Sequence, residues 1–475
     1  MTDRLGGTAD LSCDVAIIGA GTAGLAAQRS ASAAGASTLL IDPAFGGTTC
    51  ANTGCMPSKL LISAGDAAHG VREADTFGIR ATPEVDGRAV MARVHRLRDR
   101  FVKGVTDSIA ELPDAVKITA RARFAAPDRL VLDDGRSVMA GAVVIATGSS
   151  PAIPRAFDAV SDAVLTNAYL FELDDLPRSV AVIGAGPIGV ELAQALARLG
   201  VEVAVFDKGD RVAGLQDAEV SQTLAKLLAK ELPLHLGTEP EVARAEGGVR
   251  LSWDGQSKSF ERLLLAVGRP PNLDGLDLGK AGIALDEHGT PGFDPETLRC
   301  GTSRVFIAGD ANQDRPLLHE ASHEGRIAGQ NAATCPEVAR FSRHVPFVLT
   351  FTRPEAAEVG HIPDPDDPDI AVASAPYDDQ GKARVEHRLG GLCRIYARRS
   401  DGRLTGASLC APDAGHLAHF FALALEAGMG ANDLLSVPFY HPTLEEGLKP
   451  ALRALCKATG RKVPALREDD ALRGL

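Results

Sequence analysis

Long apolar runs are missing from this sequence. No stretch of about 18 apolar residues is free of charge or glycine, so no transmembrane helix is expected. The first twelve residues, MTDRLGGTADLS, have no apolar core of the signal-peptide kind. We therefore expect a cytoplasmic protein.

Positive charge is also in deficit. The chain has 50 Lys and Arg against 62 Asp and Glu, which gives a net charge of −12. Phosphate backbones and anionic lipid surfaces repel such a chain, so we expect neither nucleic acid nor a membrane as a partner.

Cysteine is sparse as well, with 8 in 475 residues. Six of them are far apart in sequence, which excludes a disulfide scaffold and favours buried, reduced thiols. What the sequence has in quantity is glycine, 49 residues.

The length of the chain, 475 residues, predicts two to four domains.

A glycine-rich turn follows the first apolar segment. Residues 13–42 contain a strand pattern, the turn Gly19-x-Gly21-x-x-Gly24, an alanine-rich helix, and a second strand that ends at Asp42. Such glycines let backbone N–H groups approach a pyrophosphate at a helix N-terminus, and the acid can accept from a ribose hydroxyl. One copy of this motif is weak evidence for a dinucleotide site.

The same pattern recurs at residues 179–207. Its glycines are Gly184, Gly186 and Gly189, and its acid is Asp207. Two complete copies predict two bound dinucleotides and hydride transfer between them. Asp207 would repel a 2′-phosphate and so favours NAD(H), with NADP(H) the less favoured cofactor.

Lys208 and Arg211 follow Asp207 closely in the sequence. Their positive charges would soften the repulsion of a 2′-phosphate, so the preference for NAD(H) is not absolute.

Two cysteines five positions apart, Cys50 and Cys55, raise three alternatives. A structural disulfide this short would remove little chain entropy. A zinc site needs further ligands at metal spacing, none of which is evident, so no metal is expected. A redox pair is favoured, because Pro57 suits a helix start near Cys55 and a helix N-terminus stabilises a thiolate.

Together with the stretch CANTGCMPSK (50–59), these motifs resemble the flavin-dependent pyridine nucleotide–disulfide oxidoreductases. Further resemblances carry the match to about residue 450: they are VVIATGSSP (143–151), LLLAVGRPPN (263–272), VFIAGDAN (305–312), FTRPEAAEVG (351–360) and HPTLEE (441–446).

The resemblance implies an α/β fold with two Rossmann-like dinucleotide-binding domains and an α+β dimerisation domain, as in glutathione reductase. The expected segments are an FAD-binding domain at 11–153, an NAD-binding domain at 154–274, a central segment at 275–343 that completes the FAD site, and an interface domain at 344–475. An obligate homodimer is expected.

By the same resemblance, Cys50 is the interchange thiol and Cys55 lies against the flavin. The residues expected to bind FAD are Gly19, Gly21, Gly24, Asp42, Thr49, Lys59, Thr147, Gly148 and Asp310. Those expected to bind NAD(H) are Gly184, Gly186, Gly189, Glu191, Asp207 and Gly268. In the family, the lysine at position 59 pairs with the glutamate at position 191.

His441 with Glu446 fits an acid–base pair that moves protons to and from thiols, and in the family this histidine reaches the cysteines of the other subunit. Thr443 and Glu446 also match a capping box, so a helix start is the alternative. Both readings can hold at once.

One departure from the family lies at GGTTC (46–50), where Thr48 replaces a usual glycine. A β-branched residue fits a positive φ poorly, so an altered loop is expected there.

By the same resemblance, the expected substrate is a dithiol or disulfide, most like the dihydrolipoyl group of dihydrolipoyl dehydrogenases. A lipoyl-bearing protein and another small disulfide both remain open as the thiol carrier. The tail has no cysteine pair, which disfavours mercuric reductase and large thioredoxin reductase. The alternatives are a glutathione-like, NADPH-dependent reductase, a flavin electron-transfer enzyme that does not use both thiols, and a flavin-loaded regulatory subunit.

Overall fold

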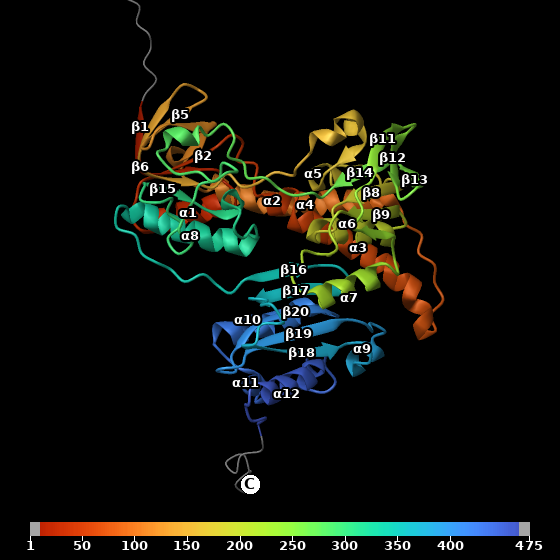
Figure 1. The fold of residues 1–475 in the computed structure, drawn as a ribbon. Helices are drawn as coiled ribbons and strands as arrows, with labels where there is room; N and C mark the ends of the chain where they lie inside the picture. The colour runs from red at the N-terminus through yellow and green to blue at the C-terminus, as the bar shows by residue number, and fades with distance from the viewer. Residues whose placement is uncertain (1–9, 465–475) are drawn as a thin grey trace, which may run out of the picture. The chain divides into compact units, whose positions relative to one another are not determined.

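A computed structural model describes residues 10–464. The expectations about the N-terminal signal segment and the cysteine-free tail fall in part on residues 1–9 and 465–475, outside the described residues. Figure 1 shows the course of the chain.

The chain forms two units, and each is built from stretches that are distant in sequence. Unit 1 takes in the chain up to Pro57, then 92–152 and 268–343, and unit 2 takes in 58–91, 153–267 and the chain from His344 onward. The division falls inside two long helices, α3 (Cys55–Glu73) and α4 (Gly87–Ala110). The four-segment division expected above remains a proposal.

The main sheet of unit 1 runs in the order β3-β2-β1-β6-β5-β4, with β15 paired to β6. Its strands are β1 (Leu11–Ile18), β2 (Thr38–Asp42), β3 (Lys117–Thr119), β4 (Ala122–Ala126), β5 (Arg129–Leu132), β6 (Ser137–Ile145) and β15 (Val305–Ile307). The pairs that involve β1, and those of β2 with β3 and of β15 with β6, are parallel. Val15 to Ile18 are buried on alternate faces, which explains the unbroken apolar run.

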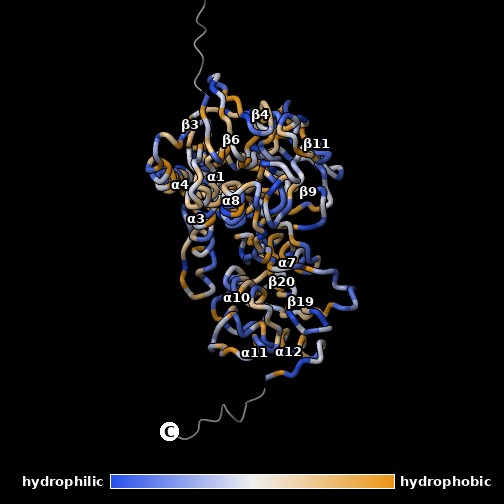
Figure 2. The backbone as a smooth tube through the Cα atoms, turned by 90° about the vertical axis from the view of Figure 1, so that its left-hand side faces the viewer, coloured by the Kyte–Doolittle hydropathy of each residue, from blue (hydrophilic) through white to orange (hydrophobic). Residues whose placement is uncertain are grey.

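Helices α1 (Thr22–Ala33) and α8 (Leu318–Thr334) of unit 1 lie side by side (Figure 1). A Cβ added at Gly325 would lie 2.2 Å from the carbonyl oxygen of Ala23, and one at Gly329 would lie 2.2 Å from that of Ala27. The two backbones therefore touch, and only glycine fits at these two positions of α8. Figure 2 shows the same pair from the side.

Unit 2 contains a five-stranded parallel sheet in the order β10-β9-β8-β14-β7. Its strands are β7 (Val164–Leu165), β8 (Ser179–Ile183), β9 (Glu202–Asp207), β10 (Leu234–Leu236) and β14 (Arg262–Leu265). Helices α5 (Asn167–Leu170) and α6 (Pro187–Arg198) pack against this sheet, and α7 (Ala218–Leu228) follows β9 in the chain.

A small antiparallel sheet accompanies that parallel sheet, with strands β11 (Glu241–Ala245), β12 (Gly248–Trp253) and β13 (Gln256–Phe260). The ring of Trp253 lies 4.8 Å from that of Phe206, and His235 stacks on Phe206 at 4.7 Å. The three rings join the small sheet to β9 and β10.

The C-terminal part of unit 2 is an antiparallel sheet in the order β16-β17-β20-β19-β18. Its strands are β16 (Phe347–Thr350), β17 (Glu355–Gly360), β18 (Ile370–Pro376), β19 (Leu392–Arg398) and β20 (Leu404–Ala411). Its helices are α9 (Gly381–Val385), α10 (Ala414–Glu426), α11 (Ala431–Leu435) and α12 (Lys449–Ala458). Two sheets built on parallel strands, one of them mixed, and two antiparallel sheets agree with the predicted α/β fold class.

Short helices complete the description. They are α2 (Thr49–Asn52) and the 3₁₀ turns η1 (Ala74–Phe77), η2 (Asp114–Val116), η3 (Arg155–Ala163), η4 (Leu278–Lys280), η5 (Gly309–Asn312) and η6 (Glu445–Leu448). No helix between residues 10 and 464 is both long enough and apolar enough to cross a membrane.

Candidate active site

The first glycine turn joins β1 to α1. Gly19 has φ +105°, and a Cβ there would lie 2.4 Å from the carbonyl oxygen of Ala146. A Cβ at Gly24 would lie 1.8 Å from the carbonyl oxygen of Gly19. The turn therefore closes on itself and on the end of β6, and neither glycine can be replaced without moving backbone.

The second glycine turn, between β8 and α6, repeats this geometry. Gly184 has φ +107°, and a Cβ there would lie 2.4 Å from the carbonyl oxygen of Ala266. A Cβ at Gly189 would lie 1.9 Å from the carbonyl oxygen of Gly184. The predicted second strand–turn–helix unit is thus present in three dimensions.

Each strand-end aspartate holds its own glycine turn. Asp42 accepts from the backbone N–H of Ala20 at 2.9 Å, and Asp207 accepts from that of Ala185 at 2.6 Å. Asp42 also accepts from the N–H of Phe45 at 2.8 Å. The sequence predicted these acids as ribose acceptors, and the structure adds this bracing role.

The two cations after Asp207 differ in whether their side chains are free to contact a bound nucleotide. Arg211 is engaged locally, since its guanidinium donates to the carbonyl oxygens of Leu215 and Gln216. Lys208 is exposed beside the acid.

Two features of the first turn fit a bound dinucleotide. A Cβ at Gly21 would meet nothing within 4 Å, which leaves room beside the start of α1 for a pyrophosphate. The hydroxyl of Thr147, just past β6, is buried and has no hydrogen-bond partner among residues 10–464. A buried hydroxyl normally has a partner, so a bound group is well placed to supply one. Gly186 in the second turn is equally open.

Asp310 lies in η5, directly after β15. Its carboxylate accepts from the Ser149 hydroxyl at 2.7 Å, and Arg269 donates to the same hydroxyl at 3.1 Å. Burial lowers the pKa of the Arg269 guanidinium, and the charge of Asp310 opposes that effect. Sequence reasoning named Asp310 and the neighbouring Gly148 but missed Ser149 and Arg269, although both lie inside the quoted motifs.

The two cysteines flank a tight turn. Cys50 lies in α2 and is half-buried, and Cys55 opens α3 and is exposed. A Cβ at Gly54 would lie 3.2 Å from the Cα of Cys50, so the turn folds back on the first cysteine. Helix α3 begins at Cys55 with Pro57 in its first turn, as predicted.

The expected distortion at Thr48 is absent. Thr48 has φ −95° and ψ 151°, in the extended region, and caps α2 by accepting from the N–H of Ala51 at 3.4 Å. The positive φ falls one residue earlier, on Gly47 at +91°. A β-branched residue is therefore unstrained here, and threonine is a good helix cap. Thr49 follows as the first residue of α2.

Lys59 and Glu191 form the predicted pair within unit 2. The ammonium lies 2.9 Å from the carboxylate, and the Glu191 side chain is only 6% exposed. Phe351 touches both partners: its N–H donates to Glu191 at 2.8 Å, and its ring lies 4.1 Å from the ammonium. Phe351 was missed from the sequence, although it opens the motif at 351–360.

His441 and Glu446 also meet. The Nδ1 atom of His441 lies 2.8 Å from a carboxylate oxygen of Glu446, whose other oxygen accepts from Lys449 at 3.0 Å. Hydrogen bonds from Lys449 and then from His441 lower the pKa of the Glu446 carboxyl. His441 is exposed, with 83% of its side chain accessible in the single chain.

The predicted capping box is only half formed. Glu446 accepts from the N–H of Thr443 at 3.4 Å, but the Thr443 hydroxyl donates to the carbonyl oxygen of Tyr440. The helix expected at this point begins as the 3₁₀ turn η6, with Leu444 as its N-cap.

Two further predictions concern Gly268 and metal binding. Gly268 has φ +125°, and its carbonyl oxygen accepts from the N–H of Ala152 at 3.0 Å within unit 1. In the part of the chain that the structure describes, no group of three or more His, Cys, Asp or Glu side chains could hold a metal ion.

Comparison with known proteins now identifies the family. Residues 13–325 match the model of the pyridine nucleotide-disulphide oxidoreductases, and residues 346–452 match the dimerisation domain of the same family. The chain belongs to this family. The predicted glutathione reductase-like fold is confirmed, and the match to the dimerisation domain supports a homodimer.

Curated relatives are similar in sequence to this chain over almost its whole length. The chain is 32% identical over 460 residues to the dihydrolipoyl dehydrogenase of Thermus scotoductus, which covers 94% of this chain and 97% of that protein. It is 30% identical over 450 residues to a dihydrolipoyl dehydrogenase of Bacillus subtilis, with 91% and 94% covered.

Solved structures show the same fold. LpdA of Mycobacterium tuberculosis superposes with a TM-score of 0.80 at 27% identity, covering 94% of this chain and 99% of that one. The flavoprotein disulfide reductase RclA of Escherichia coli superposes with a TM-score of 0.80 at 23% identity, covering 93% and 99%.

The chain is therefore an FAD-dependent oxidoreductase of the disulfide family, as predicted. The family uses FAD and NAD(H), which confirms the predicted cofactors.

Proposed function

We propose that the protein interconverts a dithiol and a disulfide with NAD(H), and that the substrate is a dihydrolipoyl group on a carrier protein. The contact between His441 and Glu446 carries the dithiol part of this proposal, because an enzyme that passed hydride only to oxygen or quinones would need no acid–base pair for thiols. The names of the relatives at 30% identity and above support the dihydrolipoyl assignment.

Glycine turns and their aspartates would hold both dinucleotides. For FAD these are Gly19, Gly21, Gly24 and Asp42, with Thr49, Thr147, Gly148 and Asp310. For NAD(H) they are Gly184, Gly186, Gly189 and Asp207, with Gly268. A flavin bound there would supply the two-electron chemistry that links hydride from NADH to reduction of a disulfide.

Cys50 and Cys55 would alternate between a disulfide and a dithiol. Reduced Cys50, as a thiolate, attacks the substrate disulfide and forms a mixed disulfide, and the departing sulfur takes a proton. Cys55 then attacks Cys50, which releases the second substrate thiol and restores the cysteine disulfide. The balance is NADH, one proton and a disulfide giving NAD⁺ and a dithiol.

His441 would give and take the proton in these steps. Glu446 accepts from one ring nitrogen and so leaves the other for the thiols. By the family resemblance, the histidine would serve the cysteines of the second subunit. Lys59, fixed by Glu191 and Phe351, would keep a positive charge near the flavin. The cytoplasmic location stays a prediction from sequence.

The test is NADH oxidation by the purified flavoprotein with lipoamide as acceptor, repeated with NADPH and with glutathione disulfide. We expect turnover with NADH and lipoamide, and its loss in Cys50→Ser while flavin stays bound. Full activity in Cys50→Ser would refute the thiol mechanism. Flavin reduction by NADH without lipoamide turnover would keep the family and redirect the substrate to another disulfide.

One observation favours a second candidate, use of NADPH. Lys208 is exposed next to Asp207 and could contact a 2′-phosphate. A ratio of kcat/KM for NADH over NADPH near one would support it.

A further inference from the structure

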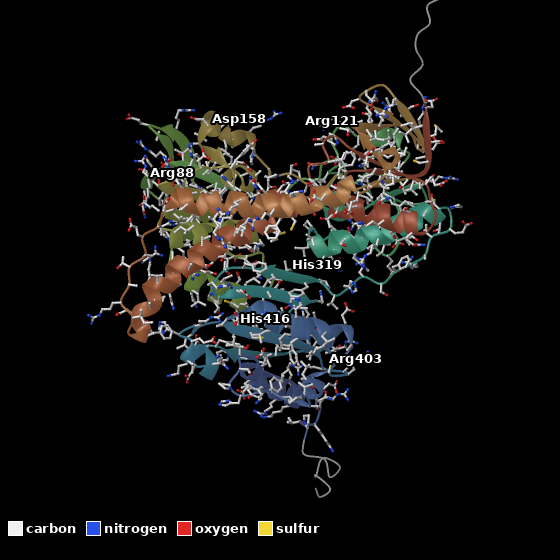
Figure 3. All side chains as sticks on the ribbon, turned by 180° about the vertical axis from the view of Figure 1, so that it is seen from behind. Arg88, Arg121, Asp158, His319, Arg403 and His416 are labelled. Atoms are coloured by element: carbon white, nitrogen blue, oxygen red, sulfur yellow. The ribbon has the colours of Figure 1, made fainter. Side chains whose placement is uncertain are left out.

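Helix α8 buries two acids, one turn apart. Glu320 is 1% exposed and Glu324 is fully buried. In Figure 3, His319 marks the first turn of this helix, directly before Glu320. Buried carboxylates are costly unless they are paired and hydrogen-bonded, so both need an explanation.

Arg343 is shared by the two acids. Its guanidinium donates to Glu320 at 2.8 Å and to Glu324 at 2.6 Å. Glu320 has a second cation, Arg315, at 3.1 Å. Burial would raise the pKa of the Glu320 carboxyl, but the hydrogen bonds from the two arginines outweigh it and the pKa is lowered.

Glu324 uses its second oxygen differently. That oxygen accepts from the backbone N–H of Gly309 and from the side-chain amide of Asn312, each at 2.7 Å. These two residues are the ends of η5, and Asp310 lies between them. Within the described residues Glu324 pairs with one cation, Arg343, and its pKa is raised because burial outweighs the charge of that arginine.

Gly309 leaves the loop little room to shift. It has φ +70°, and a Cβ there would lie 2.9 Å from the Cβ of Ala23 in the first turn of α1. The loop that carries Asp310 is therefore held from both sides, by α1 through packing and by Glu324 through hydrogen bonds.

We infer that Glu324 is a positioning residue for the flavin: oriented by Arg343, it fixes residues 309–312 so that Asp310 faces the cofactor. This inference rests on the proposed role of Asp310 in FAD binding. The inference assigns a role to Glu324, which would not touch the cofactor itself. It also explains why α8 carries an acid at a fully buried position.

A purely structural role is the competing account, and Glu320 provides the matched control. Glu320→Gln and Glu324→Gln each remove one buried charge that Arg343 neutralises. Only Glu324 reaches the loop at 309–312. In Glu324→Gln the new amide NH₂ must face either Arg343 or the two loop donors, so a donor meets a donor.

The experiment follows release of flavin from diluted holoenzyme by the rise in flavin fluorescence, alongside thermal unfolding by circular dichroism. We expect Glu324→Gln to release FAD at least about tenfold faster than the wild type. The loop at 309–312 would lose hydrogen bonds to a charged carboxylate. Glu320→Gln should unfold at a similarly reduced temperature yet release FAD at the wild-type rate within about twofold. Equal release rates in the two variants would overturn the inference.

Asn312→Ala covers the case in which Glu324→Gln does not fold. It removes one of the two hydrogen bonds from the loop to Glu324, together with the bond that the Asn312 amide oxygen accepts from the N–H of Asp314, and leaves all buried charges in place. We expect it to release FAD about threefold to tenfold faster, and a wild-type rate would overturn the inference.

Asp310→Ala separates this inference from the proposed FAD site. An unchanged release rate in Asp310→Ala would refute the site itself. Fast release in Asp310→Ala together with equal rates in the two glutamine variants would refute only the role of Glu324.

Discussion

The two strand–turn–helix motifs of the chain have the same glycine turn but different helices. Gly19 and Gly184 share a φ near +106°, at +105° and +107°, and each faces an alanine carbonyl at 2.4 Å. Two residues after the last glycine, however, α1 has Ala26 where α6 has Glu191.

That difference continues along both helices. Helix α1 packs backbone to backbone on α8 through glycine and alanine. Helix α6 instead uses a polar stripe: Glu191 binds Lys59, Gln194 donates to the carbonyl oxygen of Arg353 at 2.8 Å, and Arg198 lies 2.6 Å from Asp66. The same turn geometry thus precedes helices that are held in different ways. Helix α1 is fixed by apolar packing, whereas α6 is tied by charge to α3, the helix that begins at Cys55.

The largest expected effect comes from adding one methyl group to each turn. Gly24→Ala and Gly189→Ala each place a Cβ within 1.9 Å of a backbone oxygen, at 1.8 and 1.9 Å. Each should cost about 3 kcal/mol locally. We expect Gly24→Ala to purify without flavin, and Gly189→Ala to stay yellow but to need far more NADH, as measured by absorbance and KM. A flavin-free Gly189→Ala would show that the two turns are not independent.

The next effect tests the polar stripe. Glu191→Gln leaves Lys59 without its carboxylate, so we expect kcat for lipoamide reduction to fall about tenfold while flavin content is unchanged. Ala26→Ser, at the equivalent position of α1, is the control and should keep wild-type kcat. Equal kcat values in the two variants would mean that the stripe serves stability alone.

A smaller effect distinguishes the roles of the two strand-end aspartates, Asp207 and Asp42. Asp207→Asn keeps an oxygen that can accept from Ala185 but removes the charge that repels a 2′-phosphate. The ratio of kcat/KM for NADH over NADPH should fall about tenfold. Asp42→Asn should weaken FAD retention and leave that ratio unchanged. A changed ratio in Asp42→Asn would contradict the assignment of the two turns.

The smallest effect concerns the exposed cation. Lys208→Ala should lower kcat/KM for NADPH about threefold, because exposed charge pairs contribute little, and should leave NADH kinetics unchanged. Arg211→Ala is the comparison, since Arg211 is already bonded to backbone carbonyls. A larger loss of NADPH activity in Arg211→Ala would reverse the assignment of the two cations.

Local patterns in the sequence predicted the glycine turns, their acids and the start of α3 at Cys55, because spacing along the chain decides these features. The pairs of Lys59 with Glu191 and of His441 with Glu446 came from family resemblance, and the structure shows both contacts. The cofactor and catalytic roles of these residues remain proposals.

Other features depend on distant backbone and were beyond the sequence. The sequence predicts a positive φ at Thr48, but the structure has it one residue earlier, on Gly47, so Thr48 is unstrained. The bracing of each turn by its aspartate, the contact of Phe351 with Lys59 and the hold of Glu324 on η5 all join segments far apart in the chain. For Glu324, the sequence offered one signal: an acid in the middle of α8, a helix rich in small residues and therefore expected to pack closely.

The aromatic stack on β9 gives this enzyme a built-in optical probe. Trp253 is the single tryptophan of the chain, and its ring packs on Phe206, the residue directly before Asp207. Emission excited at the indole band therefore reports on the surroundings of the parallel sheet of unit 2, whereas visible absorbance reports on the flavin. Melting curves recorded in these two channels would show whether the parallel sheet of unit 2 unfolds before the flavin is released.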